Sequence, residues 1–443
     1  MACAVIVAAC GGKGGNADGG GDDAPPGDAD GDGPPPETPL TDRLVVATVT
    51  APAGVMAGDS NWRIWGRASL RVAPVFTVPV ADCGTLVGYT TGGATPTARV
   101  ARLDANDQLV TTYDLGAFEL RGLAGEPDGH FGALLWDATA NPPVLYVKRY
   151  DKTGAPGFST SLADALAAPT DFGIGESRLE FGGGKYGAYF HVHGISDFAN
   201  GHEGDALHWV DAASGAKTTG WPWGCSHSMS ELLRYNGTGF LSACVTDCYP
   251  GTSGTNFATE SIGGIYLDKA KKVADVDGAC NGSVAGELGG LTPASTGWRL
   301  VFNTHQAPAT KGQSSYSSST MNQDIGFAVI SSNGATSSIV WLTTTPGNEA
   351  NASIARWQPF GDDTEQFVVG WSAGNAYKLA RVAPNGDVLA APIDIVAKWG
   401  ERDDPFRVHQ NGDVVWSWFD AAGATSFKFA RLKSGRTATC AQL

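Results

Sequence analysis

The sequence is short of charge, and of positive charge above all. Charged residues make up 17% of its 443 residues, and 30 Lys and Arg stand against 45 Asp and Glu, for a formal net charge of −15. A negative balance of this size repels nucleic-acid phosphates and anionic lipid headgroups. Nucleic-acid binding is therefore not expected. No later stretch approaches the ~18 consecutive apolar residues of a membrane-spanning helix, so none is predicted.

Catalytic motifs of fixed spacing are also missing. There is no GxSxG sequence for a nucleophilic serine. His202-Glu203-Gly204-Asp205 lacks the second His of HExxH, and turn phrases such as DANDQ (104–108) are too short for a calcium loop. The sequence thus offers no ready-made catalytic centre, and it favours a binding protein over an enzyme.

Glycine and tryptophan, by contrast, are plentiful. Gly 60, Trp 13 and 42% hydrophobic residues favour a turn-rich β protein with a substantial core.

The first ten residues, MACAVIVAAC, end in a pattern typical of bacterial lipoproteins. In Val7-Ala8-Ala9-Cys10 the Cys after two small residues is predicted to carry the lipid, so 1–10 is predicted to be a lipoprotein signal segment. No Lys or Arg precedes its apolar run, which indicates a truncated segment. The Gly/Asp/Pro-rich residues 11–41 are predicted to be a disordered tether. We expect a lipid-anchored envelope protein, at the outer membrane or cell surface, that touches the membrane only through its lipid. The alternative is a chance apolar start on a cytosolic protein.

After residue 43 the sequence repeats one pattern seven times. The pattern consists of a strand, a polar turn and a second strand. The first residue of each turn is Asp104, Asp151, Asp211, Asp268, Ser331, Ala383 and Lys433, which lie 47, 60, 57, 63, 52 and 50 residues apart. These steps are close to the period of a propeller blade with loop insertions. An apolar strand and a weaker strand precede each copy of the pattern. Four strands repeated seven times predict an all-β fold, a seven-bladed β-propeller of four-stranded antiparallel blades over residues 43–443.

At this level the chain resembles lipid-anchored propeller proteins of Gram-negative bacterial envelopes. The resemblance covers about residues 43–443, rests on architecture and implies no catalytic residue. We expect a monomer. The segment 43–50 should add a strand near the seam of the ring, on a blade that the sequence does not identify.

Six cysteines remain after Cys3 and Cys10, and an even number in an exported chain favours disulfides. Cys83 in the first blade and Cys440, placed in the last strand of the seventh, would seal the ring. Zinc bound by Cys225, His227, Cys244 and Cys248 is the alternative for the second cluster, although CxxC and HxxxH spacings are missing. A hairpin turn at 236–238 brings Cys248 opposite residue 226, which favours Cys225 with Cys248 and Cys244 with Cys280. Cys225 with Cys244 and Cys248 with Cys280 is the other pairing.

Long loops predict the functional face. In each blade the connection between the second and third strands leaves on the same face as the connection to the next blade. The former is long only in blades 3, 4 and 5, at 194–204, 248–261 and 306–324. The stretch WPWGCSHS (221–228) is predicted to be the connection between blades 3 and 4, opening onto that face. Loops on a rigid scaffold commonly carry binding groups.

The leading hypothesis is that this face binds a glycan or protein ligand. Its candidate residues are Trp221, Trp223, His227, Asp247, Tyr249 and His305. A divalent metal (Zn or Ca) held by His193, His202, His227 and His305 would instead suggest a metal-dependent hydrolase or lyase. These histidines could also simply hydrogen-bond loop backbone, and a structural envelope component without a ligand is a third reading.

Overall fold

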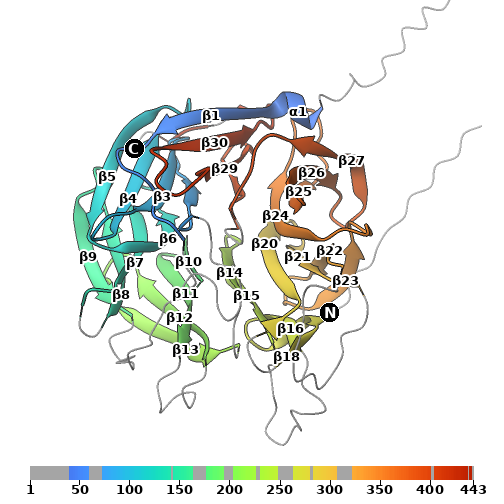
Figure 1. Cartoon of the computed structure of the whole chain (residues 1–443), viewed down its shortest axis with the longest axis horizontal. Coiled ribbons are helices and arrows are strands. Elements are labelled where there is room, and N and C mark those ends of the chain that lie inside the picture. The colour runs from blue at the N-terminus through green and yellow to red at the C-terminus, as the bar shows by residue number, and fades with distance from the viewer. Residues whose placement is uncertain are drawn as a thin grey trace, which may run out of the picture. The chain divides into compact units, whose positions relative to one another are not determined.

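The computed structural model describes residues 39–58, 72–140, 143–162, 176–193, 203–225, 230–247, 263–279, 283–306, 322–400, 404–437 and 439–441. Seven four-stranded antiparallel sheets stand around one axis (Figure 1). This confirms the predicted seven-bladed β-propeller. No helix in the described part of the chain is long and apolar enough to cross a membrane.

Each blade runs from an inner strand at the axis to an outer strand at the rim. Blade 1 consists of β2 (Phe76–Pro79), β3 (Thr85–Thr91), β4 (Thr97–Leu103) and β5 (Leu109–Gly116), and blade 2 of β6 (Glu119–Gly125), β7 (Phe131–Asp137), β8 (Val144–Tyr150) and β9 (Pro156–Ser161). Blade 3 consists of β10 (Ser177–Gly182), β11 (Lys185–His193), β12 (Glu203–Asp211) and β13 (Lys217–Gly224). Blade 4 consists of β14 (Ser230–Tyr235), β15 (Phe240–Thr246), β16 (Gly263–Leu267) and β17 (Lys271–Val276). Blade 5 consists of β20 (Gly286–Ala294), β21 (Gly297–Thr304), β22 (Asp324–Ile330) and β23 (Thr336–Trp341), and blade 6 of β24 (Glu349–Trp357), β25 (Gln366–Ala373), β26 (Ala376–Val382) and β27 (Val388–Ile395). Blade 7 consists of β28 (Arg407–Val408), β29 (Val414–Trp418), β30 (Ser426–Leu432) and β1 (Leu44–Thr50). Strand β1 follows the short helix α1 (Leu40–Arg43). A two-stranded ribbon, β18 (Gly278–Ala279) with β19 (Ser283–Val284), lies between blades 4 and 5 in the chain.

The polar turn of the repeat is built by its first side chain. Asp104 Oδ1 accepts the backbone N–H groups of Asn106 and Gln108 at 2.8 and 2.9 Å, and Asp151 Oδ1 accepts those of Thr153 and Ala155 at 2.8 and 2.9 Å. An Asp side chain that bonds its own backbone two residues on favours a tight turn. The repeated pattern therefore reports this turn between the third and outer strands.

The hydrophobic core lies between successive blades. Leu232 and Ile265 of blade 4 pack with Leu288 and Phe302 of blade 5 in one buried cluster. The second strands have apolar side chains on both faces because both faces are covered, and every residue of β3 is buried. The outer strands lie at the rim, and in β5 and β27 every position except Leu115 is exposed or half-buried.

The ring closes at blade 7 with a strand from the other end of the chain. Strand β1 pairs antiparallel with β30, from Leu44 opposite Leu432 to Thr50 opposite Ser426. The added strand predicted at 43–50 is thus the outer strand of blade 7. The prediction that Cys440 lies in a last strand is wrong, because β1 already occupies that edge and the chain after Leu432 continues without a strand through residue 437. The predicted Cys83–Cys440 disulfide is confirmed.

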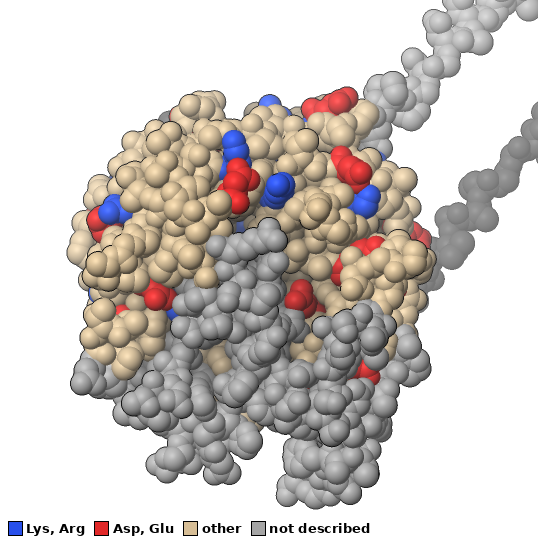
Figure 2. Space-filling view, in the orientation of Figure 1, with Lys and Arg blue, Asp and Glu red and all other residues tan. Residues whose placement is uncertain are grey.

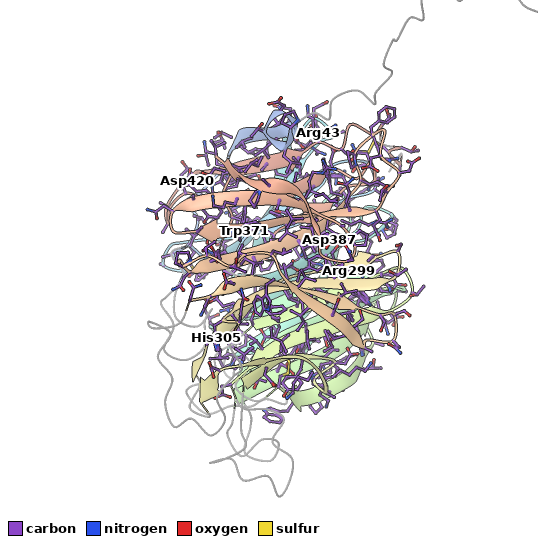
Figure 3. All side chains as sticks on the ribbon, turned by 90° about the vertical axis from the view of Figure 1, so that its right-hand side faces the viewer. Arg43, Arg299, His305, Trp371, Asp387 and Asp420 are labelled. Atoms are coloured by element: carbon purple, nitrogen blue, oxygen red, sulfur yellow. A yellow bond between two sulfur atoms is a disulfide. The ribbon has the colours of Figure 1, made fainter. Side chains whose placement is uncertain are left out.

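The two faces of the disc are seen edge-on in Figure 3. His305 and Asp420 lie at one edge, and Arg299 and Asp387 lie at the other. The first face carries the connections between second and third strands and between blades, and we call it the loop face. The second carries the tight turns, and we call it the turn face.

Candidate functional site

The loop face holds a pocket of about 340 Å³ where blades 6, 7 and 1 meet. Its lining combines aromatic, apolar and hydrogen-bonding groups: Val72, Ala73, Val75, Asn351, Ser372, Gly374, Asn375, Tyr377, Lys398, Trp399, Gly400, Trp418, Phe419 and Asp420. A concave site of a few hundred Å³ with aromatic walls and a few polar groups is typical of small-ligand binding.

Trp399 anchors the floor of this pocket. It follows β27 and is 3% exposed. Its indole N–H donates to the carbonyl of Asn351 at 2.7 Å, and its own carbonyl accepts from the Tyr377 hydroxyl at 3.1 Å. The ring packs edge-on against Tyr377 and Phe406, with ring centroids 4.7 and 5.1 Å away. Packing and hydrogen bonds together hold the floor in one conformation.

Asn351 turns the backbone of β24 beside that floor. Its φ of 53° lies in the left-handed region, which Asn tolerates better than most residues. The ladder between β24 and β25 shifts register between Ala350 and Ser353. The Asn351 amide donates to the Ser372 hydroxyl at 2.9 Å. The bulge thus positions the carbonyl that holds the Trp399 indole and the amide that holds the Ser372 hydroxyl.

The mouth of the pocket is polar. The Trp418 indole donates to Asp420 Oδ1 at 3.1 Å. The side chains of Asn375, Lys398 and Asp420 are exposed. Figure 2 looks onto this loop face, where Lys and Arg side chains lie close to Asp and Glu among mostly uncharged residues. The pocket can therefore offer hydrogen bonds and both signs of charge above an aromatic floor.

The structure separates the two predicted tryptophans, both of which lie within β13. WPWG is therefore strand and not connection, and the connection begins at Cys225. Residues two apart on a regular strand share one face, but β13 bulges between the pairs Leu207–Trp221 and Asp205–Gly224, so Trp221 faces blade 4 and Trp223 faces blade 2. Trp221 packs beside Tyr189, while Trp223 packs against a cluster that includes Trp136. They do not form one binding surface.

His305 and Asp247 lie on the loop side of blades 4 and 5. Nε2 of His305 and Oδ2 of Asp277 form a hydrogen bond. Asp277 directly precedes Gly278, whose backbone lies too close to the Asp247 carbonyl for any side chain at that position. The prediction that Asp247 and His305 share one region is consistent with this geometry. His193 is placed at the end of β11, and His202, His227 and Tyr249 lie outside the described residues.

Cys225 and Cys244 are joined by a disulfide that ties blade 3 to blade 4, with their Cα atoms 6.6 Å apart. The favoured pairing of Cys225 with Cys248 is wrong, and the alternative pairing of Cys225 with Cys244 is confirmed. The hairpin register was nearly right, since Ser230 faces Val245. It could not be extended to Cys225, however, because β14 begins only at Ser230 and Cys225 belongs to the preceding blade. Cys248 and Cys280 lie outside the described residues.

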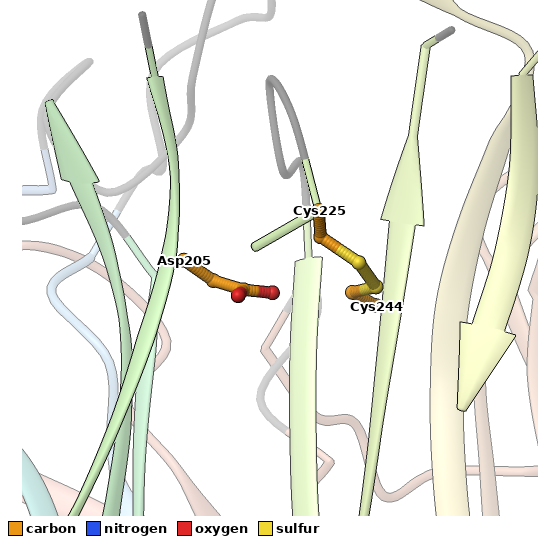
Figure 4. A group of neighbouring side chains, drawn as sticks. All are labelled: Asp205, Cys225 and Cys244. Carbon is orange, nitrogen blue, oxygen red and sulfur yellow. A yellow bond between two sulfur atoms is a disulfide. The ribbon is translucent and has the colours of Figure 1, made fainter. Parts of the chain in front are cut away.

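Asp205 on β12 lies next to this disulfide (Figure 4). Among the described residues, Asp205, Cys225 and Cys244 alone place three potential metal ligands within 4.8 Å of one another. Zinc binds cysteine as the thiolate, and the disulfide removes both thiolates. Burial raises the pKa of Asp205 from its ordinary 3.8 to about 7, although the Tyr189 hydroxyl and the Trp221 indole donate to the carboxylate.

Paired charges close the axis of the ring. Arg234 on β14 forms ion pairs with Asp404, which precedes β28, and with Glu180 on β10 at 3.5 Å. Arg407 lies 3.7 Å from Asp404. Burial raises the pKa of Asp404 to about 7, against the opposing effect of Arg234. These pairs join blades 3, 4 and 7 and give the axis a structural role.

The pocket residues were missed because loop length and histidine content guided the sequence analysis. They could have been found from the rule that connections between second and third strands lie on the same face as connections between blades. Applied to Lys398-Trp399-Gly400 after blade 6 and to Trp418-Phe419-Asp420 in blade 7, the rule places both on the loop face of adjacent blades.

Comparison with known proteins finds only distant likenesses. No protein-family model matches the sequence, and no curated protein matches it. The chain is similar to the Dos1 propeller (12% identity, TM-score 0.42, 86% of this chain and 98% of that one). It is also similar to the α-L-arabinanase of Penicillium chrysogenum complexed with arabinobiose (9%, 0.44, 88% and 99%) and to the polysaccharide lyase Uly1 (8%, 0.49, 88% and 99%). Likenesses this distant carry no argument about a ligand.

Proposed function

We propose that this chain is an exported envelope lipoprotein whose propeller binds a glycan on its loop face. The pocket at blades 6, 7 and 1 carries this proposal. The half-buried Tyr377 supplies an apolar ring surface for a sugar above the buried indoles of Trp399 and Trp418, and Asn375 and Asp420 at the mouth supply partners for its hydroxyl groups. Its volume suits one or two sugar rings.

Export is supported by the two disulfides. Cystine persists in oxidising compartments, and both bonds hold blades together. With Cys10 lipidated, the protein would be held at the outer membrane or cell surface. The predicted residues Asp247 and His305 lie on the loop side of blades 4 and 5, the same side of the ring as the pocket. We therefore keep them as candidate contacts for a ligand larger than the pocket.

The test is binding to arrayed neutral and acidic oligosaccharides, followed by calorimetry with those that bind. The double variant Asn375→Ala, Asp420→Ala removes two exposed polar groups from the mouth and leaves the floor intact. We expect it to weaken binding roughly tenfold to a hundredfold, since each lost hydrogen bond to a ligand is worth about 1 kcal/mol or more.

The matched control is Asp363→Ala, which removes a 98% exposed carboxylate on the turn face. It should leave the affinity unchanged. Equal affinities of the double variant and the wild type would contradict the assignment of the pocket. Absence of binding to every oligosaccharide, with capture of an envelope protein that the double variant loses, would show a protein ligand in place of a glycan.

A further inference from the structure

Exposed apolar side chains are confined to one part of the ring. Within the described ranges, every large hydrophobic residue counted as exposed comes from blades 6, 7 or 1 or from the connection after blade 6. Val110 is 60% exposed, Phe360 72% and Leu389 49%. Isolated apolar residues on a surface are ordinary, but a concentration on neighbouring elements indicates an interaction site.

The repeats provide an internal control for this observation. In blades 1 to 6 the turn after the third strand leads directly into the outer strand. The first two residues of the outer strand are equivalent between blades, because the first of them pairs with the end of the third strand. Blades 1 and 6 have Leu109-Val110 and Val388-Leu389 there, and blade 7 has Leu44-Val45 on β1. Blades 2 to 5 have Pro156-Gly157, Lys217-Thr218, Lys271-Lys272 and Thr336-Ser337. The fold therefore does not require apolar residues at this position.

The turn face inside this rim continues the same surface. Phe360 lies in the turn between β24 and β25, and Val408 ends β28 at 39% exposed. Both line an open hollow of about 590 Å³ together with Arg356 and Arg436. These arginines are paired with Glu365 and Asp363, respectively. The exposed apolar side chains therefore border a mostly polar hollow whose two arginines are neutralised by ion pairs, which suits zwitterionic headgroups better than anionic ones.

The chain itself enters at the centre of this surface. Helix α1 leads into β1, the outer strand of blade 7, which stands between blades 6 and 1. Arg43 lies at the same edge of the disc as Asp387 of the turn face (Figure 3). Residues 1–38 therefore join the propeller where its exposed apolar side chains are concentrated.

We propose that this basal rim, formed by Val45, Leu109, Val110, Phe360, Val388 and Leu389, rests on a zwitterionic lipid surface. The proposal depends on the proposed lipid anchor, which would bring the rim to the membrane at its own entry point. Apolar contact with the bilayer adds to the hold of a lipid anchor. In this orientation the loop face and its pocket point away from the lipid.

Flotation of the full chain with vesicles of phosphatidylcholine and phosphatidylethanolamine tests the rim. Cys10→Ser removes the lipid, so that only the rim can bind. In that background Val45→Lys, Val110→Lys and Leu389→Lys together should lower the partition coefficient roughly tenfold or more. The matched control, Gly157→Lys, Thr218→Lys and Ser337→Lys, adds the same charge at equivalent positions of blades 2, 3 and 5 and should bind like the parent.

A second variant, Val45→Thr with Val110→Thr, keeps the β-branched shape and so preserves the strands; it should lose part of the binding. The proposal is wrong if the parent does not float, if the Lys triple and its control float equally, or if the triple instead abolishes a dimer seen by light scattering. Mass spectrometry of the mature N-terminus tests lipidation separately. An unmodified Cys10 would refute the anchor while leaving the flotation result to stand on its own.

Discussion

Disulfides close two seams of the ring, and the two bonds have different structural effects. At the seam between blades 3 and 4, Cys225 and Cys244 are 19 residues apart in the chain, and the blades they join already follow one another. At the seam between blades 7 and 1, Cys83 and Cys440 are 357 residues apart, and β1 crosses over to complete blade 7. The first bond staples neighbours, whereas the second closes the whole fold.

The same two regions also differ in where the repeat varies. Blades 3 to 5 have long connections on the loop face and polar residues at the start of their outer strands. Blades 6, 7 and 1 have short connections between their second and third strands, an aromatic pocket, and exposed apolar residues at the start of their outer strands. The second strands are buried in both regions, as in β3 and β21. The inner part of each blade therefore maintains the ring, and its ends are free to differ in function.

The largest effect should come from opening the long-range seam. If a disulfide acts by restricting the unfolded chain, closing a loop of 357 residues stabilises by about 6 kcal/mol and closing one of 19 residues by about 3 kcal/mol. We expect Cys83→Ser with Cys440→Ser to lower the free energy of unfolding about twice as much as Cys225→Ser with Cys244→Ser, measured in urea. Once all three proteins are reduced with a dithiol, the two variants and the wild type should be equally stable. Equal losses would break the distinction between the seams.

Rising pH should weaken the seam between blades 3 and 4. Asp205 has a pKa of about 7 in the folded protein against an ordinary 3.8. The stability that its neutral form contributes is therefore complete below about pH 4 and is lost as pH rises through 7. At about 1.4 kcal/mol per pKa unit, the loss is up to about 4 kcal/mol. Asp205→Asn should remove this part of the pH dependence, so that its stability relative to wild type grows from pH 4 to 7. Asp394→Asn, at an exposed carboxylate, should follow the wild type. A parallel course for Asp205→Asn would refute the effect.

The fold was predictable because the repeated pattern recurs at a spacing typical of a propeller blade. Asp104, Asp151 and Asp211 mark turns whose hydrogen bonds are local, and local chemistry can be read from sequence. The strands and the Cys83–Cys440 bond follow from that count. The place of β1 on blade 7 does not, because its pairing with β30 depends on a contact between the two ends of the chain.

The candidate site was harder to predict, for two physical reasons. A bulge in β13 sends Trp221 and Trp223 to opposite sides of blade 3, although residues two apart on a regular strand share one face. The pocket gathers Asn351, Trp399 and Trp418 from separate elements, and its floor depends on a left-handed residue and on buried packing that no short motif records. Loop length indicated the right face but not the part of it that is hollowed.

Falling pH should weaken the other seam. His409 of blade 7 hydrogen-bonds through Nε2 to the Thr85 hydroxyl of blade 1 at 2.9 Å, and burial, reinforced by Arg431, lowers its pKa from 6.5 to about 4. The stability that its neutral form contributes is complete above about pH 6.5 and is lost as pH falls through 4, by up to about 3 kcal/mol. His409→Gln keeps a hydrogen-bonding group near Thr85 without the charge, so its loss of stability between pH 6.5 and 4 in urea titrations should be smaller than in the wild type. His130→Gln, at a more exposed histidine, is the control. Because Asp205 and His409 titrate in opposite senses, acid should loosen the seam between blades 7 and 1 while it tightens the one between blades 3 and 4; hydrogen exchange that rose at both seams together would contradict this division.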